Sequence, residues 1–350
     1  MNIFRMGCAA AGALAAGGIV AAFTGSGTML SLLTQASIYA VFAMGVGVLL
    51  RQNGMVSFGH ALFFGVAGYG LGILLKLGAM PAELAIVLTL AGIALASFLI
   101  GLVIVRVPGV AFSMMTLAIG QMAFLTASRA RGLTGGADGM NIDWPERLFG
   151  MPLSLLNQPA VMLMVCWSVL VLVVLALALL LGGRFGSLTE AARDNEERAR
   201  FIGVRTLLPR AAVYALSATV TGLAGILSAL NTSFVSPESL HWSVSGVALM
   251  MVVVGGYKAL WGPALGAMVY FMFKDVVGDY ATHWMAIFGI ALIAVIVFSP
   301  AGIAGALGRL VRRHGGSGAA TAITAATAAA TTSTASATSD APAARAASAH

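Results

Sequence analysis

The hydrophobic positions of this chain form long, continuous runs separated by short charged or glycine-rich gaps. The run over 161–181 contains no charged residue, and its apolar positions do not alternate with polar ones. A bilayer offers no water to an unpaired backbone group, so only helices and closed barrels cross it, and barrel strands alternate. Runs near the ~20 residues that a crossing helix needs fall at 7–24, 29–50, 56–75, 82–105, 109–127, 160–181, 211–234, 244–257, 262–276 and 283–299.

This pattern predicts an all-α integral membrane protein, a polytopic bundle of about ten transmembrane or partly re-entrant helices. The runs at 56–75, 244–257 and 262–276 are short or interrupted by glycine. Each is either a full span or a broken helix lining a cavity, because irregular backbone is tolerated in a membrane only where protein or water surrounds it. The run at 7–24 is interpreted as a retained first helix, with a signal peptide cleaved near 25–27 as the alternative.

Composition supports the membrane assignment, since 59% of the residues are apolar and 9% are charged, against about 25% charged in soluble domains. The formal net charge is +7, but in such a protein basic residues set orientation and do not indicate nucleic acid. With both termini in the cytoplasm, 14 of the 19 Lys and Arg residues lie inside. Cys8 and Cys166 both lie in apolar runs, without the spacing of a metal site or redox pair.

The sequence predicts two parts, a transmembrane permease domain over 1–310 and a tail over 311–350. The tail is rich in Ala, Thr and Ser and contains no aromatic residue. Because it has almost nothing to bury, we expect it to be a disordered cytoplasmic segment.

Several kinds of chemistry have no support in the sequence. It contains no G-x-x-x-x-G-K-[ST] loop, so the chain cannot bind ATP in that manner by itself. No predicted span carries Asp or Glu at its centre, and ion-coupled carriers usually keep such buried carboxylates. No serine-protease-like set and no H-E-x-x-H helix is present. We therefore expect a protein that is not an enzyme and that uses neither cofactor nor metal.

A charged loop, residues 182–210, carries six arginines between two apolar runs. Ser187 and Glu190 have the spacing of a capping box, and Gly203 suits a left-handed C-cap. Between them the sequence predicts a helix of about 15 residues, with Glu196 and Arg200 paired on one side. An apolar stripe on the helix suits docking into another protein's groove, with a merely solvated loop as the alternative. The stripe comprises Leu188, Ala191, Ala192, Ala199 and Ile202.

Two further stretches contain polar groups among small residues. Ser57 and His60 stand at the start of a glycine-rich helix, where His60 either serves a pathway or is a satisfied interior histidine. Gln121 ends an apolar run and is either a ligand group or a contact between helices. A turn-rich loop, 133–139, follows on the outer side.

Six blocks, in order, resemble the LivM-type permease subunits of bacterial ABC importers for branched-chain amino acids. They are Val56-Ser-Phe-Gly-His-Ala-Leu-Phe-Phe-Gly; Met115-Thr-Leu-Ala-Ile-Gly-Gln-Met with Leu133-Thr-Gly-Gly-Ala-Asp-Gly-Met; Ala191-Ala-Arg-Asp-Asn-Glu-Glu-Arg-Ala-Arg-Phe-Ile-Gly; Gly222-Leu-Ala-Gly; Phe234-Val-Ser-Pro-Glu-Ser-Leu-His-Trp-Ser-Val-Ser-Gly; and Val254-Gly-Gly-Tyr-Lys-Ala-Leu-Trp-Gly-Pro-Ala-Leu-Gly.

The resemblance implies import of branched-chain amino acids across the bacterial inner membrane. The implied partners are a second, LivH-like permease, two cytoplasmic ABC ATPases and a periplasmic solute-binding protein. The helix over 187–203 would couple to an ATPase, and a loop would face the binding protein through Thr134, Gly135, Gly136 and Gly139. The implied pathway or gate residues are Ser57, Gly59, His60, Gln121, Gly255 and Gly256.

Departures from the family pattern leave the substrate open. Glu196 stands where general ABC importers keep glycine in their coupling loop. Val247 replaces a common acidic residue, and 257–259 replace Gly-Leu-Gly. Urea or short amides are therefore the alternative substrates. An ATP-independent carrier or channel and a receptor-like membrane protein are the alternative functions.

Overall fold

The computed structural model describes residues 11–15, 17–19, 21, 26–78, 80–107, 109–201, 203, 205–280, 283–299 and 302–306. The chain divides into one compact unit, Met1–Gly305, and a second, Ala306–His350. The fold below is that of the first unit. The predicted tail lies outside the described residues, as does much of the predicted first span.

Six helices of the described chain are long and apolar enough to cross a membrane. Five are α2 (Gly27–Asn53), α4 (Ala82–Ile104), α5 (Val110–Arg129), α8 (Pro159–Leu181) and α11 (Leu207–Thr232). The sixth begins with α14 (Trp284–Phe298). The three runs predicted to be short or broken form the shorter helices α3 (His60–Lys76), α12 (Trp242–Gly255) and α13 (Gly262–Gly278). A multi-pass helical protein is therefore confirmed, whereas about ten spans and the position of the termini stay predictions.

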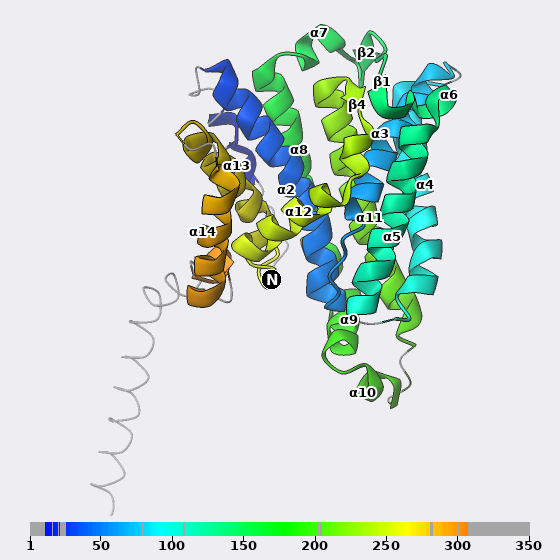
Figure 1. Cartoon of the computed structure of the whole chain (residues 1–350), viewed down its shortest axis with the longest axis vertical. Helices are drawn as coiled ribbons and strands as arrows, with labels where there is room; N and C mark the ends of the chain where they lie inside the picture. The colour runs from blue at the N-terminus through cyan, green and yellow to red at the C-terminus, as the bar shows by residue number, and fades with distance from the viewer. Residues whose placement is uncertain are drawn as a thin grey trace, which may run out of the picture. The chain divides into compact units, whose positions relative to one another are not determined.

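Short elements connect the helices. They are α6 (Arg131–Thr134), η1 (Gly136–Asp138), β1 (Met140–Asn141), β2 (Arg147–Leu148), β3 (Met151–Pro152), α7 (Leu153–Leu156), β4 (Phe234–Val235) and η2 (Pro237–Leu240). Among them, α6, α7, β1 and β2 lie at the end of the bundle opposite α9 (Arg184–Asp194) and α10 (Glu196–Phe201) (Figure 1). Strand β1 pairs antiparallel with β4, and β2 pairs antiparallel with β3. The β1–β4 pairing ties the loop after α5 to the segment after α11.

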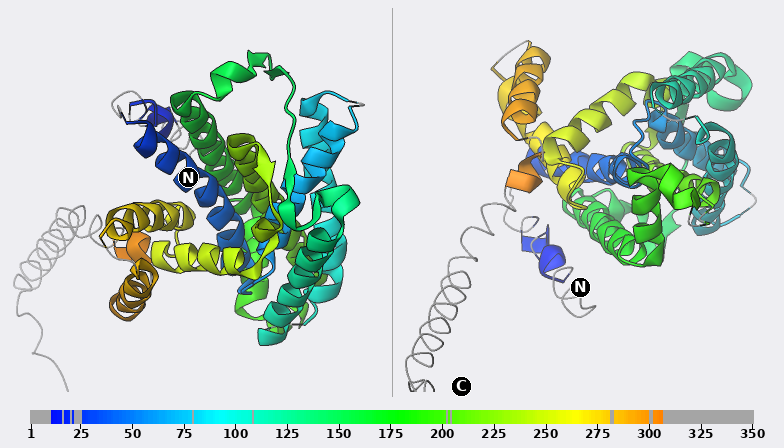
Figure 2. Two further views of the ribbon diagram at one scale, coloured as in Figure 1. Left: turned by 45° about the horizontal axis from the view of Figure 1, so that its top comes forward. Right: turned by 90° about the horizontal axis from the view of Figure 1, so that it is seen from below.

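The core lies around α2 and α11. Helix α2 packs against α8, α11, α12 and α13, and both views in Figure 2 show it running through the middle of the unit. Glycines permit the close approach in this core: a Cβ added to Gly225 of α11 would lie 2.1 Å from the carbonyl oxygen of Phe64 in α3. Small residues thus let the backbones meet, as is usual between membrane helices.

Candidate functional site

The charged loop folds into two helices, α9 (Arg184–Asp194) and α10 (Glu196–Phe201). The predicted capping box is wrong, because α9 begins at Arg184 after Gly183 and includes Ser187. The Ser187 hydroxyl donates to the Arg184 carbonyl at 3.1 Å instead of capping. The earlier start is possible because Gly186 has no side chain: a Cβ there would lie 1.9 Å from the Leu181 carbonyl oxygen.

The predicted single helix is interrupted at Asn195, whose backbone is extended with φ −156° and ψ 99°. The Asn195 side-chain oxygen accepts the backbone N–H of Arg198 at 2.9 Å, so this residue caps α10. Gly203 follows with φ +85°, the left-handed conformation that the sequence predicts for it. Ile202 lies outside the described residues. The interruption gives α9 and α10 separate attachments to the bundle.

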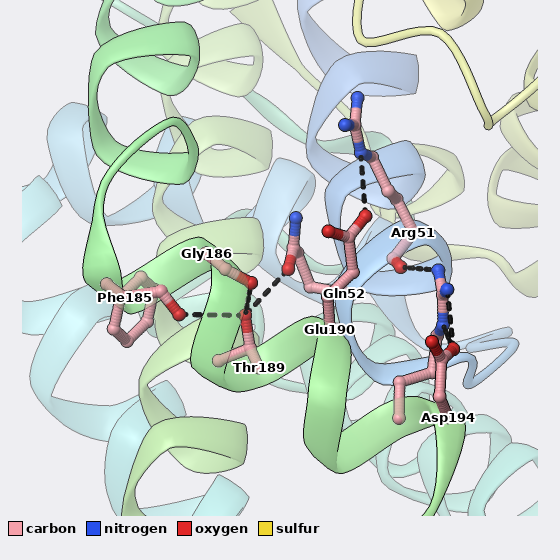
Figure 3. Close-up of polar contacts among 8 residues, drawn as sticks. Arg51, Gln52, Phe185, Gly186, Thr189, Glu190 and Asp194 are labelled. Atoms are coloured by element: carbon pink, nitrogen blue, oxygen red, sulfur yellow. Dashed lines mark hydrogen bonds and ion pairs between the residues drawn. The ribbon is translucent and has the colours of Figure 1, made fainter.

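Helix α9 is held by the last turn of α2 (Figure 3). Thr189 Oγ1 donates to Gln52 Oε1 at 2.6 Å, and both side chains are fully buried. Arg193 Nη1 donates to the Arg51 carbonyl at 2.6 Å, and the Glu190 carboxylate lies 4.0 Å from Arg51 Nε. Buried hydrogen bonds of this kind are costly to break, because the remaining partner stays desolvated. Helix α9 is therefore firmly joined to a central helix of the core.

Helix α10 is attached through Glu196. Its carboxylate pairs with Arg200 at 2.6 Å, accepts from Thr206 Oγ1 at 3.0 Å and also pairs with Arg210 at the start of α11. Partial burial opposes ionisation of Glu196, but the charge of Arg210 and the hydrogen bonds hold the pKa of its carboxyl below its ordinary value. The Arg210 carbonyl in turn accepts from Asn53 Nδ2 at 3.0 Å. Glu196, which stands where general ABC importers keep glycine, thus joins α10 to α11 by an ion pair with Arg210.

The predicted apolar stripe divides in the folded loop. Ala192 and Ala199 are buried against the protein's own bundle, whereas Leu188 is half-buried and Ala191 is exposed. Phe201, at the end of α10, is 89% exposed. The loop therefore has an inner face that anchors it and an outer face that is free in this chain.

The predicted pathway residues Ser57 and His60 belong to a buried hydrogen-bonded chain. His60 Nδ1 lies 2.8 Å from Ser57 Oγ, and His60 Nε2 lies 2.7 Å from Ser217 Oγ. Because Ser217 donates its hydroxyl to the Gly45 carbonyl at 2.6 Å, it accepts from a protonated Nε2, which assigns the histidine tautomer. This series of hydrogen bonds joins α3 to α11 and α2. A role of these residues in a pathway stays a prediction.

The other predicted pathway residues lie at the start of α3, in α5 and at the end of α12. Gly59 packs closely on the backbone of Thr116 in α5, and Gly255 packs on the Gly262 carbonyl at the α12–α13 junction. Gly256 lies in the turn that ends α12. The side-chain oxygen of Gln121 is buried without a hydrogen-bond partner. Gly59 and Gly120, the neighbour of Gln121, are therefore in close contact, whereas Gly255 and Gly256 belong to another junction, and a shared pathway role stays a prediction.

The loop predicted to face a binding protein is anchored to the bundle. Thr134 is buried and its hydroxyl donates to the Ala127 carbonyl at 2.6 Å. Gly135 and Gly136 form the turn that follows, and Gly139 packs on the backbone of Val235 in β4. Its docking role stays a prediction.

Sequence reasoning missed the residues that secure the charged loop. Arg51, Gln52 and Asn53 are three consecutive polar residues at the end of an apolar run. The charge count that predicts orientation includes Arg51 but says nothing of its contacts. A polar triplet at a helix terminus was the available signal, because in a membrane protein such groups lie where they find partners.

These features define the chain as a multi-pass helical membrane protein with a structured loop at one end. It belongs to the family of permease components of branched-chain amino acid transport systems, whose model matches residues 28–298. LivM, a high-affinity branched-chain amino acid transport system permease protein, is 26% identical over 297 residues in Salmonella typhimurium and in Escherichia coli K12, covering 78% of this chain and 69% of each relative.

A second set of relatives has a different transport name. The autoinducer 2 import system permease protein LsrC of Escherichia coli is 29% identical over 287 residues, covering 77% of this chain and 78% of the relative. No solved structure matches the chain.

Proposed function

We propose that this chain is the transmembrane permease subunit of an ATP-driven importer in the bacterial inner membrane. It translocates branched-chain or other hydrophobic amino acids that a periplasmic binding protein delivers. A LivH-like permease and two ATPase subunits complete the assembly. The family match over 28–298 and the LivM relatives support this proposal most directly.

The attachment of α9 and α10 supports a role for the charged loop in coupling to an ATPase. A loop that transmits force must be joined to the helices that it moves and must offer a free face to its partner. The Thr189–Gln52 and Glu196–Arg210 contacts supply the first property. Exposed Ala191 and Phe201 supply the second. The alternative of a merely solvated loop does not account for the buried Thr189–Gln52 and Glu196–Arg210 contacts.

The coupling role is tested by substitutions on the exposed face, because Ala199 is buried and changing it would disturb the fold. Ala191→Asp and Phe201→Ser, made together, are expected to abolish ATP hydrolysis stimulated by the loaded binding protein. Glu197→Gln, on the same helix as Phe201, serves as a surface control. Unchanged stimulation in the double variant, with the assembly intact, would contradict the coupling role.

The substrate is tested separately, because the LsrC relatives favour a second candidate, an import system for another small solute. Uptake of radiolabelled leucine, urea and autoinducer 2 is compared in a strain lacking this chain and in its complemented parent. We expect only leucine uptake to depend on the chain. Loss of urea or autoinducer uptake alone would assign that substrate instead. Saturable uptake by proteoliposomes that contain this chain alone would establish an ATP-independent carrier.

A further inference from the structure

A cavity of about 430 Å³ lies beside α9, where the end of α2 meets the turn between α12 and α13. Three stretches that are far apart in the sequence line it: Leu50, Arg51 and Gly54; Glu190 and Arg193; and Tyr257 and Lys258. The first two stretches are in direct contact, since Arg193 Nη1 donates to the Arg51 carbonyl and a Cβ added to Gly54 would lie 3.1 Å from Arg193 Cγ. The cavity thus places residues 257–258, which belong to another connection of the bundle, next to the charged loop.

The lining of this cavity is mainly basic, because Arg51, Arg193 and Lys258 give it three positive charges and Glu190 gives it one negative charge. Arg51 Nε lies 4.0 Å from the Glu190 carboxylate (Figure 3), and Arg193 pairs with Asp194 at 2.7 Å. Even with Asp194 counted, three positive charges face two negative ones. None of the ion pairs among the described residues involves Lys258. Lys258 is therefore the cation of this cavity that is available to a partner.

The cavity adjoins the exposed face of α9. Ala191, which is exposed, directly follows Glu190 in that helix, and Lys258 is exposed as well. A protein that docks on this face of α9 therefore covers the cavity beside it. A carboxylate suits the cavity best, because hydrogen bonds between an ammonium or guanidinium group and a carboxylate are about twice as strong as neutral ones. Charge complementarity of this kind also selects the partner and raises the rate of association.

We infer that this cavity receives an acidic side chain of the ATPase subunit, which pairs with Lys258. The turn between α12 and α13 then forms one docking surface together with α9. Because Arg51 ends α2 and Lys258 precedes α13, the ATPase contacts two further parts of the core besides the charged loop; α2 and α13 also pack on each other. The inference rests on the proposed function and adds to it the chemistry of the partner's surface and a second segment that binds it.

The test measures the Kd of the purified ATPase subunits for this chain and its partner permease in nanodiscs of phosphatidylcholine. Lys258→Glu is expected to raise the Kd about tenfold or more at low salt, and Lys258→Met is expected to raise it less. The difference from the wild type is expected to shrink as salt is added, because exposed ionic contacts are screened. Lys258→Arg is expected to bind normally. Arg106→Glu, which reverses an exposed charge just after α4 and outside the cavity, is the matched control and is expected to bind normally.

Several outcomes would overturn the inference. Normal binding by Lys258→Glu, together with weakened binding by the Ala191→Asp and Phe201→Ser double variant, would remove the cavity from the docking surface and leave the coupling role of α9 standing. Equal weakening by Arg106→Glu would show a general charge effect. A Lys258→Glu effect found only in nanodiscs that contain phosphatidylglycerol would assign the cavity to an anionic lipid headgroup instead. If the ATPase does not bind the wild-type permeases, the proposed function fails, and the inference fails with it.

Discussion

The central and peripheral helices of this bundle differ in burial and in the residues that make burial possible. In the most apolar stretches, 78% of α2 and 72% of α11 is buried, against 22% of α4 and 28% of α8. A buried hydroxyl of α11, Ser217, donates across to the Gly45 carbonyl of α2. The buried hydroxyls of α4, Thr89 and Ser97, bond only within their own helix, and α8 contains no glycine. Lipid is as apolar as leucine, so hydrophobicity does not drive helix association here. Close packing and hydrogen bonds decide which helices are central.

The largest expected effect comes from the central glycine contacts. Gly225→Ala would bring a methyl group to 2.1 Å from the Phe64 carbonyl oxygen, and such overpacking costs about 3 kcal/mol. Gly92→Ala in α4 meets no atom within 4 Å and is expected to be neutral or slightly stabilising. The stability of both variants is measured by unfolding the detergent-solubilised protein with SDS. Equal stability of the two variants would remove the distinction between centre and periphery.

A smaller effect is expected at buried hydroxyls. Ser217→Ala leaves His60 Nε2 without its acceptor in a fully buried position, which costs about 2 kcal/mol. Ser168→Ala in α8 removes only an exposed hydroxyl that donates to its own helix, at the Met164 carbonyl, and is expected to change stability little. The same SDS titration compares them. If the Ser168 variant lost as much stability as the Ser217 variant, the buried hydrogen bonds through His60 would contribute no more than an exposed one.

Helix α9 of the charged loop contains both a buried and an exposed hydroxyl. Thr189→Val leaves Gln52 Oε1 buried and unpaired, and we expect a cost of about 1–2 kcal/mol for the attachment of α9. Ser187→Ala affects an exposed hydroxyl and is the control. Faster amide hydrogen exchange in α9, with unchanged exchange in α11, is the expected signature. Unchanged exchange in the Thr189 variant would mean that the Thr189–Gln52 bond does not hold the loop.

The smallest expected effect is the pH dependence of the α10 attachment. The folded-state pKa of Glu196 is below the ordinary value of 4.5. Its stabilisation is therefore complete above about that pH, and it is lost as the pH falls through the lower folded value. Being partly exposed, the Glu196 cluster is expected to contribute below about 1 kcal/mol. In the wild type, the amides of α10 should exchange faster as the pH falls. Glu196→Gln should remove this pH dependence, and Glu197→Gln, an exposed neighbour, should leave it unchanged. An identical pH profile in both variants would contradict the ionic link.

Much of the helical fold follows from hydrophobic runs alone. The predicted spans from 29 onward each coincide with a helix, and the three short or broken runs are the shorter helices α3, α12 and α13. The reason is that a bilayer requires every backbone group to be satisfied within its own segment. That local requirement is visible in the sequence.

The candidate site was predicted less completely, because its contacts join residues far apart in the chain. The Ser187–Glu190 spacing suggested a cap, but packing at Gly186 moved the helix start, and Asn195 divided the helix. The partners Gln52 and Thr189 are separated by 137 positions. No local pattern marks such a pair.

The sequence by itself determined the class of membrane protein, the helical segments and the family resemblance, since each depends on composition, run length or local order. Only the tertiary structure decided which helices lie at the centre and which face of the charged loop is free. Those features arise from long-range packing in a medium that does not reward hydrophobic burial, so close backbone approach and buried polar contacts select the arrangement.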